Sequence, residues 1–265
     1  STRVVAGVVL AAIALLITAV PAADQVPADG GPIQITPLLH ASVQIEHRGR
    51  VIQIDPWSAA DLAHARQADL ILVTDNNPHH LDVAAIRRVR KPGAPVVIPA
   101  AGREAVPDGL VLGNGDAQTV GGVRVEAIAA YDIKPGPPEH PKGEANGYVV
   151  TLGGKRLYFA GVTECVPEVA ALRGIDVAFM PMNIPVERMM PAAAAECVKR
   201  IAPKVVYLYH YDQDYSARVT NPRAVPQGLP GGLTVPQSLE RFRAALQGTG
   251  IEFRMGDWYP ARVPK

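Results

Sequence analysis

Several histidines and aspartates that could bind a metal or transfer protons follow apolar segments of the chain. Residues 70–82 begin with four apolar residues, which predict a buried strand, and continue as a cluster of Asp, Asn and His that includes His79 and His80. His140 lies in a Pro-rich loop, and His210 directly follows another apolar run. Because loops at one edge of a sheet converge, these four histidines are candidates for a metal or acid–base site.

Three aspartates occupy similar positions at the ends of expected strands, namely Asp55, Asp75 and Asp132. The alternative for the whole set is that scattered His and Asp side chains cap loops and form ordinary hydrogen bonds. For His47 and His64, which are expected in a hairpin end and a surface helix, this simpler role is the better interpretation.

The composition favours a globular domain with a sizeable core and gives no sign of a nucleic-acid partner. Apolar residues make up 48% of the chain, and 26 Lys and Arg nearly balance 25 Asp and Glu. The two cysteines, Cys165 and Cys197, are not spaced like a zinc motif. The sequence leaves open whether they form one disulfide or stay as two buried thiols.

The first 22 residues predict a membrane anchor. Residues 4–20 are apolar or small except for Thr18, carry no charge and follow Arg3. A cleaved signal peptide is the alternative. We expect residues 23–32 to be a tether and residues 33–265 to be the domain. The positive-inside rule then places most of the chain in a periplasmic, extracytoplasmic space.

The order of the expected elements predicts an α/β domain with two packed sheets and helices outside. Strands are expected at 33–36, 40–47, 51–55, 68–74, 96–99, 121–129, 147–152, 155–160, 175–180, 204–209 and 251–255. Helices are expected at 59–67, 83–89, 191–201 and 238–247. Residues 213–236 read as a long irregular loop that could cover a site near His210.

Several strings in this order resemble the metallo-β-lactamase superfamily, in particular its ascorbate-6-phosphate lactonase-like branch of metal-dependent hydrolases. They include His40-Ala41-Ser42, Ile54-Asp55-Pro56-Trp57, His140-Pro141-Lys142-Gly143, Tyr158-Phe159-Ala160-Gly161 and Tyr209-His210-Tyr211. The resemblance runs from about residue 33 to the end, and it implies a four-layer αββα sandwich.

The metal motifs depart from the family pattern. The family's His-x-His-x-Asp-His string reads Asp75-Asn76-Asn77-Pro78-His79-His80 here, so that only His80 keeps its place. Val162 stands where the family has an Asp that bridges two metals, and valine has no ligand atom. His140 and His210 match the remaining two histidines of the family. The resemblance therefore implies that the binuclear site is lost.

From these departures we expect a pseudoenzyme with no catalytic residue, no metal and no cofactor. It would act as a membrane-anchored accessory or structural subunit of an integral membrane protein complex, respiratory or photosynthetic. The alternative is a mononuclear hydrolase of a small phosphate ester or lactone, with one Zn or Mn ion held by His79, His80, His140 and His210. A third hypothesis is a binding protein that keeps a pocket for a small ligand.

Overall fold

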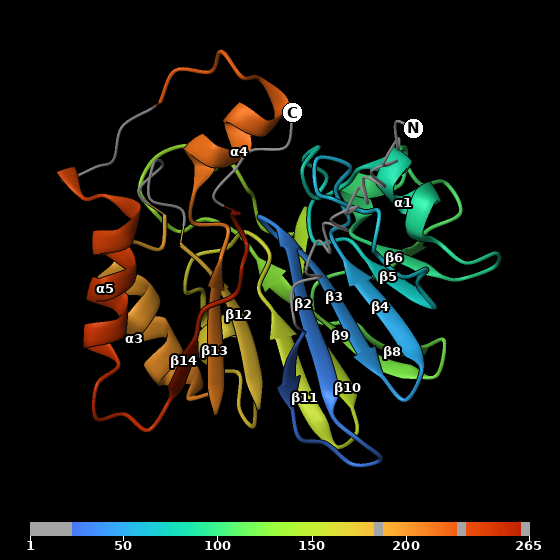
Figure 1. The fold of residues 1–265 in the computed structure, drawn as a ribbon, viewed down its shortest axis with the longest axis horizontal. Coiled ribbons are helices and arrows are strands. Elements are labelled where there is room, and N and C mark those ends of the chain that lie inside the picture. The colour runs from blue at the N-terminus through green and yellow to red at the C-terminus, as the bar shows by residue number, and fades with distance from the viewer. Residues whose placement is uncertain (1–22, 183–187, 227–231, 261–265) are drawn as a thin grey trace, which may run out of the picture.

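The fold is built on two mixed β-sheets that pack face to face (Figure 1). A computed structural model describes residues 23–182, 188–226 and 232–260. In these residues each sheet has seven strands, and the chain completes the first sheet before it begins the second.

The first sheet follows the order of the chain from β1 to β7. Its strands are Asp24–Val26 (β1), Ile33–Leu39 (β2), Ser42–His47 (β3), Arg50–Ile54 (β4), Leu70–Leu72 (β5), Val96–Ile98 (β6) and Leu110–Val111 (β7). Strands β1 to β4 pair antiparallel, and β4 to β7 pair parallel.

The second sheet runs from β8 to β14 in the same manner. Its strands are Ala117–Val120 (β8), Val123–Ala130 (β9), Ala145–Leu152 (β10), Lys155–Phe159 (β11), Val177–Pro181 (β12), Val205–Tyr209 (β13) and Glu252–Arg254 (β14). Strands β8 to β11 are antiparallel, and β11 to β14 are parallel, so each sheet has one hairpin-built half and one crossover-built half.

Most helices lie outside the two sheets, whereas the helix at residues 213–220 lies over the ends of the strands (Figure 1). They are Val83–Val89 (α1), Pro167–Ala170 (α2), Pro191–Ile201 (α3), Gln213–Thr220 (α4) and Val235–Ala245 (α5), with a 3-10 turn at Ala100–Gly102 (η1). Ala85 and Ile86 of α1 pack on the first sheet, and Ala194 and Val198 of α3 join the core of the second. The predicted two-sheet α/β sandwich with outer helices is therefore confirmed.

Local sequence explains where the helices begin. Asp82 caps α1, since its side chain accepts a hydrogen bond from the backbone N–H of Ala85 at 3.0 Å. Pro191 begins α3, as predicted from its fixed φ angle. Thr234 and Gln237 form a capping box at the start of α5.

The predicted helix at 59–67 is wrong, because side chains bind part of its backbone and only isolated turns form, such as the bond from the N–H of Ala65 to the carbonyl of Leu62 at 3.3 Å. The N–H of Arg66 donates to Gln44 Oε1 at 2.8 Å, and its carbonyl accepts from Gln53 Nε2 at 3.1 Å. The N–H of Ala63 donates to Asp61 Oδ1 at 2.9 Å, a local bond that competes with a helical turn.

The loop predicted at 213–236 is also wrong in part. Its first eight residues form α4, capped by Asp212, whose Oδ1 accepts from Tyr215 N at 2.8 Å. Its last two residues begin α5. The prediction for residues 227–231 lies outside the described residues.

Of the N-terminal predictions, only the tether expected at residues 23–32 falls on described residues. The proposed anchor at 1–22 lies outside the described residues, and within the described ranges no helix has the length and apolarity needed to cross a membrane. Strand β1, inside the segment expected to be a tether, pairs with β2 of the first sheet.

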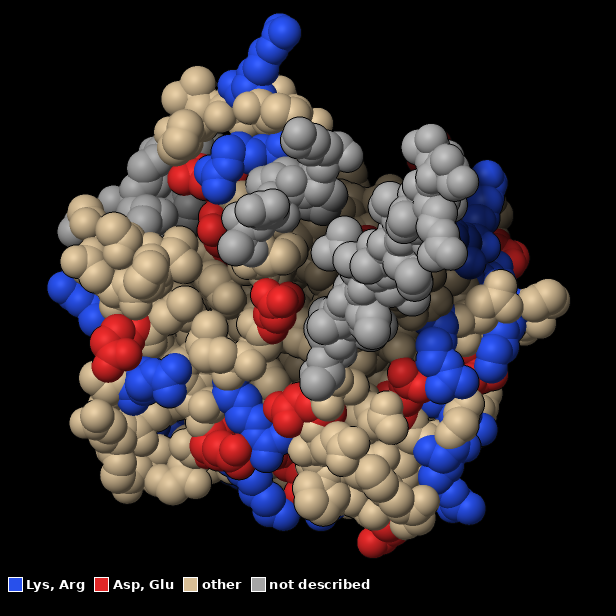
Figure 2. Space-filling view, in the orientation of Figure 1, with Lys and Arg blue, Asp and Glu red and all other residues tan. Residues whose placement is uncertain are grey.

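On the face shown in Figure 2, basic and acidic side chains of the described residues are intermixed.

A disulfide links the two cysteines, which the sequence left as either bridged or free. Cys197 lies on α3, and Cys165 lies just before α2, 32 residues earlier. The bond therefore ties the segment that precedes α2 to the longer helix α3.

Removing this bond should destabilise the fold without changing the cleft described below. For a closed loop of this length, we expect the double variant Cys165→Ser/Cys197→Ser to lose about 3–4 kcal/mol of unfolding free energy. Urea denaturation measures the loss, and wild type with reductant is the matched control. A wild type indifferent to reductant and equal in stability to the variant would show that the bond does not form.

Candidate metal centre

A cleft of about 530 Å³ opens where loops from both sheets meet. The walls come from the segments after β4, β5, β9, β11 and β12, the residue after β13, and helix α4. The lining residues are Trp57, Asn77, Pro78, His79, Glu139, His140, Val162, Arg188, His210, Gln213, Ser216, Ala217 and Thr220. The four histidines singled out from the sequence lie in or directly beside this cleft.

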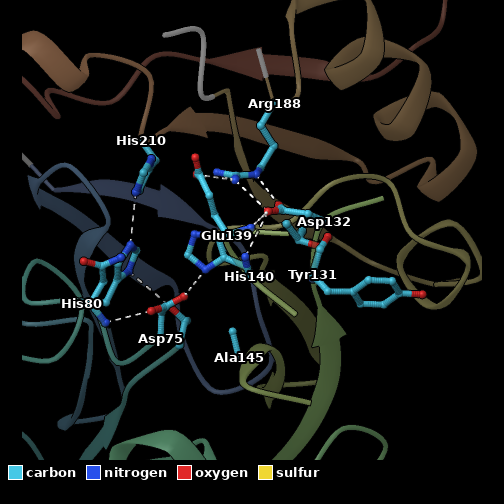
Figure 3. A network of polar contacts seen from close by, with 12 residues as sticks. Asp75, His80, Tyr131, Asp132, Glu139, His140, Ala145, Arg188 and His210 are labelled. Atoms are coloured by element: carbon cyan, nitrogen blue, oxygen red, sulfur yellow. Dashed lines mark hydrogen bonds and ion pairs between the residues drawn. The ribbon is translucent and has the colours of Figure 1, made fainter. Parts of the chain in front are cut away.

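Asp55 is the buried anchor beneath the cleft. Its carboxylate accepts hydrogen bonds from the N–H of Thr74 at 2.7 Å and from Thr74 Oγ1 at 2.5 Å, and it pairs with His80 Nδ1 at 2.7 Å. Burial would lower the pKa of His80, but the charge of Asp55 and its hydrogen bond outweigh burial and raise that pKa. His80 is therefore held in one orientation, with its Nε2 3.1 Å from His210 Nε2 (Figure 3).

Three imidazoles from distant parts of the chain form a cluster at the inner end of the cleft. Within the described residues, His40, His79 and His210 each offer a ring nitrogen, and these nitrogens lie within 4.8 Å of one another. His40 lies in the β2–β3 turn, His79 follows β5, and His210 follows β13. The rings of His40 and His210 are only 3.7 Å apart between centroids.

Contacts at Nδ1 fix the ring orientations of His40 and His210. His40 Nδ1 lies 2.6 Å from Tyr259 Oη and 2.8 Å from Ser216 Oγ. His210 Nδ1 lies 2.9 Å from the side-chain amide of Gln213. Such outer partners fix the ring orientation of metal-binding histidines.

The cluster consists of uncharged imidazoles. Burial, together with the charge of His80, lowers the pKa of His79 to about 3. Burial likewise holds the pKa of His40 and of His210 well below the ordinary histidine value, and neighbouring histidines add to the effect. Neutral imidazole is the form that binds a metal ion, because its lone pair is free.

One buried atom in the cluster lacks a partner and tests whether a metal would fit. His40 Nε2 is buried and has no hydrogen-bond partner among the described residues. An unpaired buried polar atom costs about 1–3 kcal/mol, and a metal bond at Nε2 would remove that cost. The ring nitrogens of His40, His79 and His210 lie within 4.8 Å of one another, and two imidazole nitrogens on one tetrahedral zinc ion are about 3.3 Å apart, so small shifts of the rings would bring all three nitrogens onto one ion. The residues present therefore fit a single ion.

Three acidic side chains at the cleft are paired with basic side chains (Figure 3). Asp75 Oδ2 lies 2.8 Å from His140 Nδ1. Burial would raise the pKa of Asp75, but the hydrogen bond from His140 and the charges of His80 and His140 lower it. Arg188 donates from Nη2 at 2.9 Å to both Asp132 and Glu139, and its Nε also donates to Asp132.

The sequence-predicted residues divide between the histidine cluster and these ion pairs. His79 and His210 belong to the three-histidine cluster, His80 lies beside it, and His140 is not part of it and pairs with Asp75. Val162 lines the cleft, so an aliphatic side chain does face the site. His47, whose Nε2 lies 3.0 Å from the carbonyl of Asp29, and the exposed His64 lie outside the cleft.

Sequence reasoning missed His40, Ser216 and Tyr259. His40 has a φ of 60°, a left-handed conformation that favours glycine, at the turn between two strands. A histidine at a tight hairpin turn, where Gly or Asn is usual, was the available signal. Tyr259 and Ser216 carried no such signal, because only the fold brings them to His40.

Comparison with known proteins gives a consistent family. Residues 34–210 match the model of the β-lactamase superfamily domain. A UPF0173 metal-dependent hydrolase of Symbiobacterium thermophilum is 32% identical over 68% of this chain and 84% of the relative. One of Thermococcus onnurineus is 27% identical over 68% of this chain and 85% of the relative.

Solved structures agree with the sequence relatives. A crystal structure of a candidate metal-dependent hydrolase from Parabacteroides distasonis has 32% identity and a TM-score of 0.75, and it covers 89% of this chain and 98% of that one. A metallo hydrolase of Ignicoccus hospitalis, at 21% identity and a TM-score of 0.62, shares the fold.

These findings correct the expectation of a pseudoenzyme that serves as a membrane accessory subunit. The relatives are named as metal-dependent hydrolases, and the described residues contain a three-histidine cluster suited to an ion. The counting of lost ligands was misleading because it followed the family positions and left out His40. The periplasmic location and the partner complex stay untested predictions.

Breaking the Arg188–Asp132 pair should be costly, since the two side chains are 1% and 0% exposed. Arg188→Met leaves a buried carboxylate unpaired, and we expect a loss of about 3–5 kcal/mol at pH 7 by urea unfolding. Glu139→Gln is the matched control, because Glu139 is 56% exposed and its pair with Arg188 should contribute less than about 1 kcal/mol. Equal losses in the two variants would contradict this account.

The Arg188–Asp132 pair also makes the free energy of unfolding depend on pH. Burial would raise the pKa of Asp132, but Arg188 and the backbone N–H of His140 outweigh burial and lower it. Its contribution is therefore complete above the unfolded pKa of about 3.9 and is lost as the pH falls through the lower folded value. The stability gap between wild type and Arg188→Met should narrow below about pH 4.

Proposed function

Because the chain belongs to the metallo-β-lactamase superfamily, we propose that it is a mononuclear metal-dependent hydrolase whose ion is held by His40, His79 and His210. The observation that carries this proposal is the cluster of three neutral imidazoles, two buried and one (His79) half-buried, with one nitrogen left unpaired. His80, held by Asp55, is a fourth candidate ligand beside them.

The donor set favours zinc. Neutral imidazole nitrogen is a common zinc ligand, and three histidines with an open fourth position are typical of catalytic zinc sites. Bound there, the ion would polarise a carbonyl or phosphoryl oxygen and lower the pKa of a water molecule.

A single ion suits the other residues of the site better than two ions. Val162 offers no ligand atom at the position where the family pattern has a bridging carboxylate. His140 Nδ1 is already bonded to Asp75, and Asp132 is bonded to Arg188. Among these residues a second ion would find only His140 Nε2 as a free ligand atom, which is too few for a binding site.

The chain's own residues position the reaction. Ser216 and Tyr259 hold His40, Gln213 holds His210, and Asp55 holds His80, so that the cluster is oriented before a ligand arrives. The cleft volume of about 530 Å³ suits a small molecule. We propose a small phosphate ester or a lactone as substrate, in line with an ascorbate-6-phosphate lactonase-like branch.

The metal proposal predicts about one equivalent of zinc per chain. Inductively coupled plasma mass spectrometry of protein purified without chelator measures it. His40→Ala, His79→Ala and His210→Ala should each weaken zinc binding by more than about 100-fold, since each removes a direct ligand. His64→Ala, outside the cleft, is the matched control and should bind zinc like wild type. Unchanged zinc binding in His40→Ala would refute the assignment.

Hydrolysis should depend on the ion. We expect turnover of at least one of 4-nitrophenyl phosphate, bis(4-nitrophenyl) phosphate and dihydrocoumarin, followed by absorbance. Dialysis against a chelator should abolish turnover, and zinc should restore it, because the ion activates the water. Turnover that survives complete removal of metal would argue for a different mechanism.

A further inference from the structure

We propose that His140, oriented by Asp75, accepts the proton of the attacking water and so replaces a second metal ion in the reaction. This inference rests on the proposed function, since it assigns the base of the same hydrolysis. It names two residues that the metal-binding cluster does not use.

The first observation is that Asp75 is held rigidly against His140. Its Oδ2 lies 2.8 Å from His140 Nδ1, and its Oδ1 accepts from the N–H of Asn77 at 2.8 Å. The Asp75 side chain is 3% exposed, so it has little freedom to turn away. A carboxylate in this position keeps the proton on Nδ1 and leaves the lone pair on Nε2.

The backbone of His140 is fixed as well. Its N–H donates to Asp132 Oδ2 at 3.0 Å, and its carbonyl accepts from the N–H of Asp132 at 3.0 Å. Asp132 is in turn held by Arg188. The imidazole of His140 is therefore oriented from both its ring and its main chain, which a proton acceptor requires.

The second observation is that the other ring nitrogen faces the cleft. His140 lines the cleft together with His79 and His210, and its side chain is 12% exposed. Nε2 has no hydrogen-bond partner among the described residues, and it is not one of their buried unpaired atoms. It is therefore reachable by a water molecule in the cleft.

The alternative role is a purely structural ion pair. In a structural ion pair, both side chains normally form further hydrogen bonds, as Arg188 and Asp132 do. In the Asp75–His140 pair, only Asp75 makes a further hydrogen bond. His140 Nε2 makes none and lies in the candidate active site. An oriented imidazole with a free nitrogen is the arrangement of a general base.

The step balances as an ordinary hydrolysis. The water oxygen bonds to the carbonyl carbon or phosphorus of the substrate, while one water proton passes to His140 Nε2. The bond from that carbon or phosphorus to the leaving oxygen breaks, and the leaving oxygen takes the proton from Nε2. Asp75 stays ionised and stabilises the transient imidazolium.

The test separates a base from a ligand by measuring zinc and turnover in the same samples. We expect His140→Gln and His140→Gly to keep about one zinc per chain and to lose about 10²–10⁴-fold in kcat with the fastest of the three probes. Added imidazole should restore turnover to His140→Gly but not to a variant that lacks the cluster ligand His79. His64→Gln is the matched control and should match wild type in both measurements.

Asp75→Asn tests the positioning role. The amide can turn its NH₂ toward His140 and favour the wrong tautomer, so kcat should fall by a comparable factor while KM and zinc content stay unchanged. Imidazole should not rescue this variant, because His140 still occupies the space. Retained zinc shows that each variant is folded.

Each other outcome has a definite meaning. Loss of zinc in both His140 variants would make His140 a ligand, which overturns this inference and leaves a metal-dependent hydrolase. Retained zinc with unchanged kcat would make the pair structural. A wild type that binds no zinc and hydrolyses none of the probes would overturn the proposed function and, with it, this step.

Discussion

The buried carboxylate of Asp55 is the constraint on which the site depends. A charge without exposure is stable only if it is paired and hydrogen-bonded, and Asp55 obtains both from Thr74 and His80. These partners follow β5, whereas Asp55 follows β4, so the ends of two parallel strands are fixed together. His80 then reaches His210 of the second sheet. One carboxylate thus sets the register of loops from both halves of the fold.

Backbone strain gathers at the same place. His40, Asp55 and His210 have φ angles of 60°, 44° and 56°, in the left-handed region that favours glycine. Such conformations cost about 1–3 kcal/mol each and persist where surrounding structure holds them. Each of these residues directly follows a strand, and His40 and His210 belong to the histidine cluster while Asp55 holds His80 beside it. The strained backbone at these three residues therefore lowers the stability of the fold, and the surrounding contacts must offset that cost.

The sequence predicted the sandwich well because its strands are apolar runs with clear turns, and helices 83–89 and 191–201 have the predicted bounds. It failed at 59–67, where Gln44 and Gln53 of neighbouring strands bind the backbone of a segment with good helix propensity. It also failed at His40, because a comparison with the family's metal motifs does not consider a histidine outside those motifs. Partners such as Ser216 meet His40 from 176 residues away, and no local pattern encodes that distance.

The charges around the proposed ligands His40, His79 and His210 are consistent with a single bound ion. Asp55, Asp75 and Asp132 lie around the cleft, and each is paired with a basic side chain, namely His80, His140 and Arg188 in that order. The cluster itself is neutral, and Val162 adds no charge. A divalent ion held by neutral imidazoles keeps its full charge, which makes it a stronger electrophile than an ion bridged by a carboxylate. Fewer ligands thus need not mean loss of function, because one ion on neutral donors can polarise a substrate while a paired imidazole takes the proton.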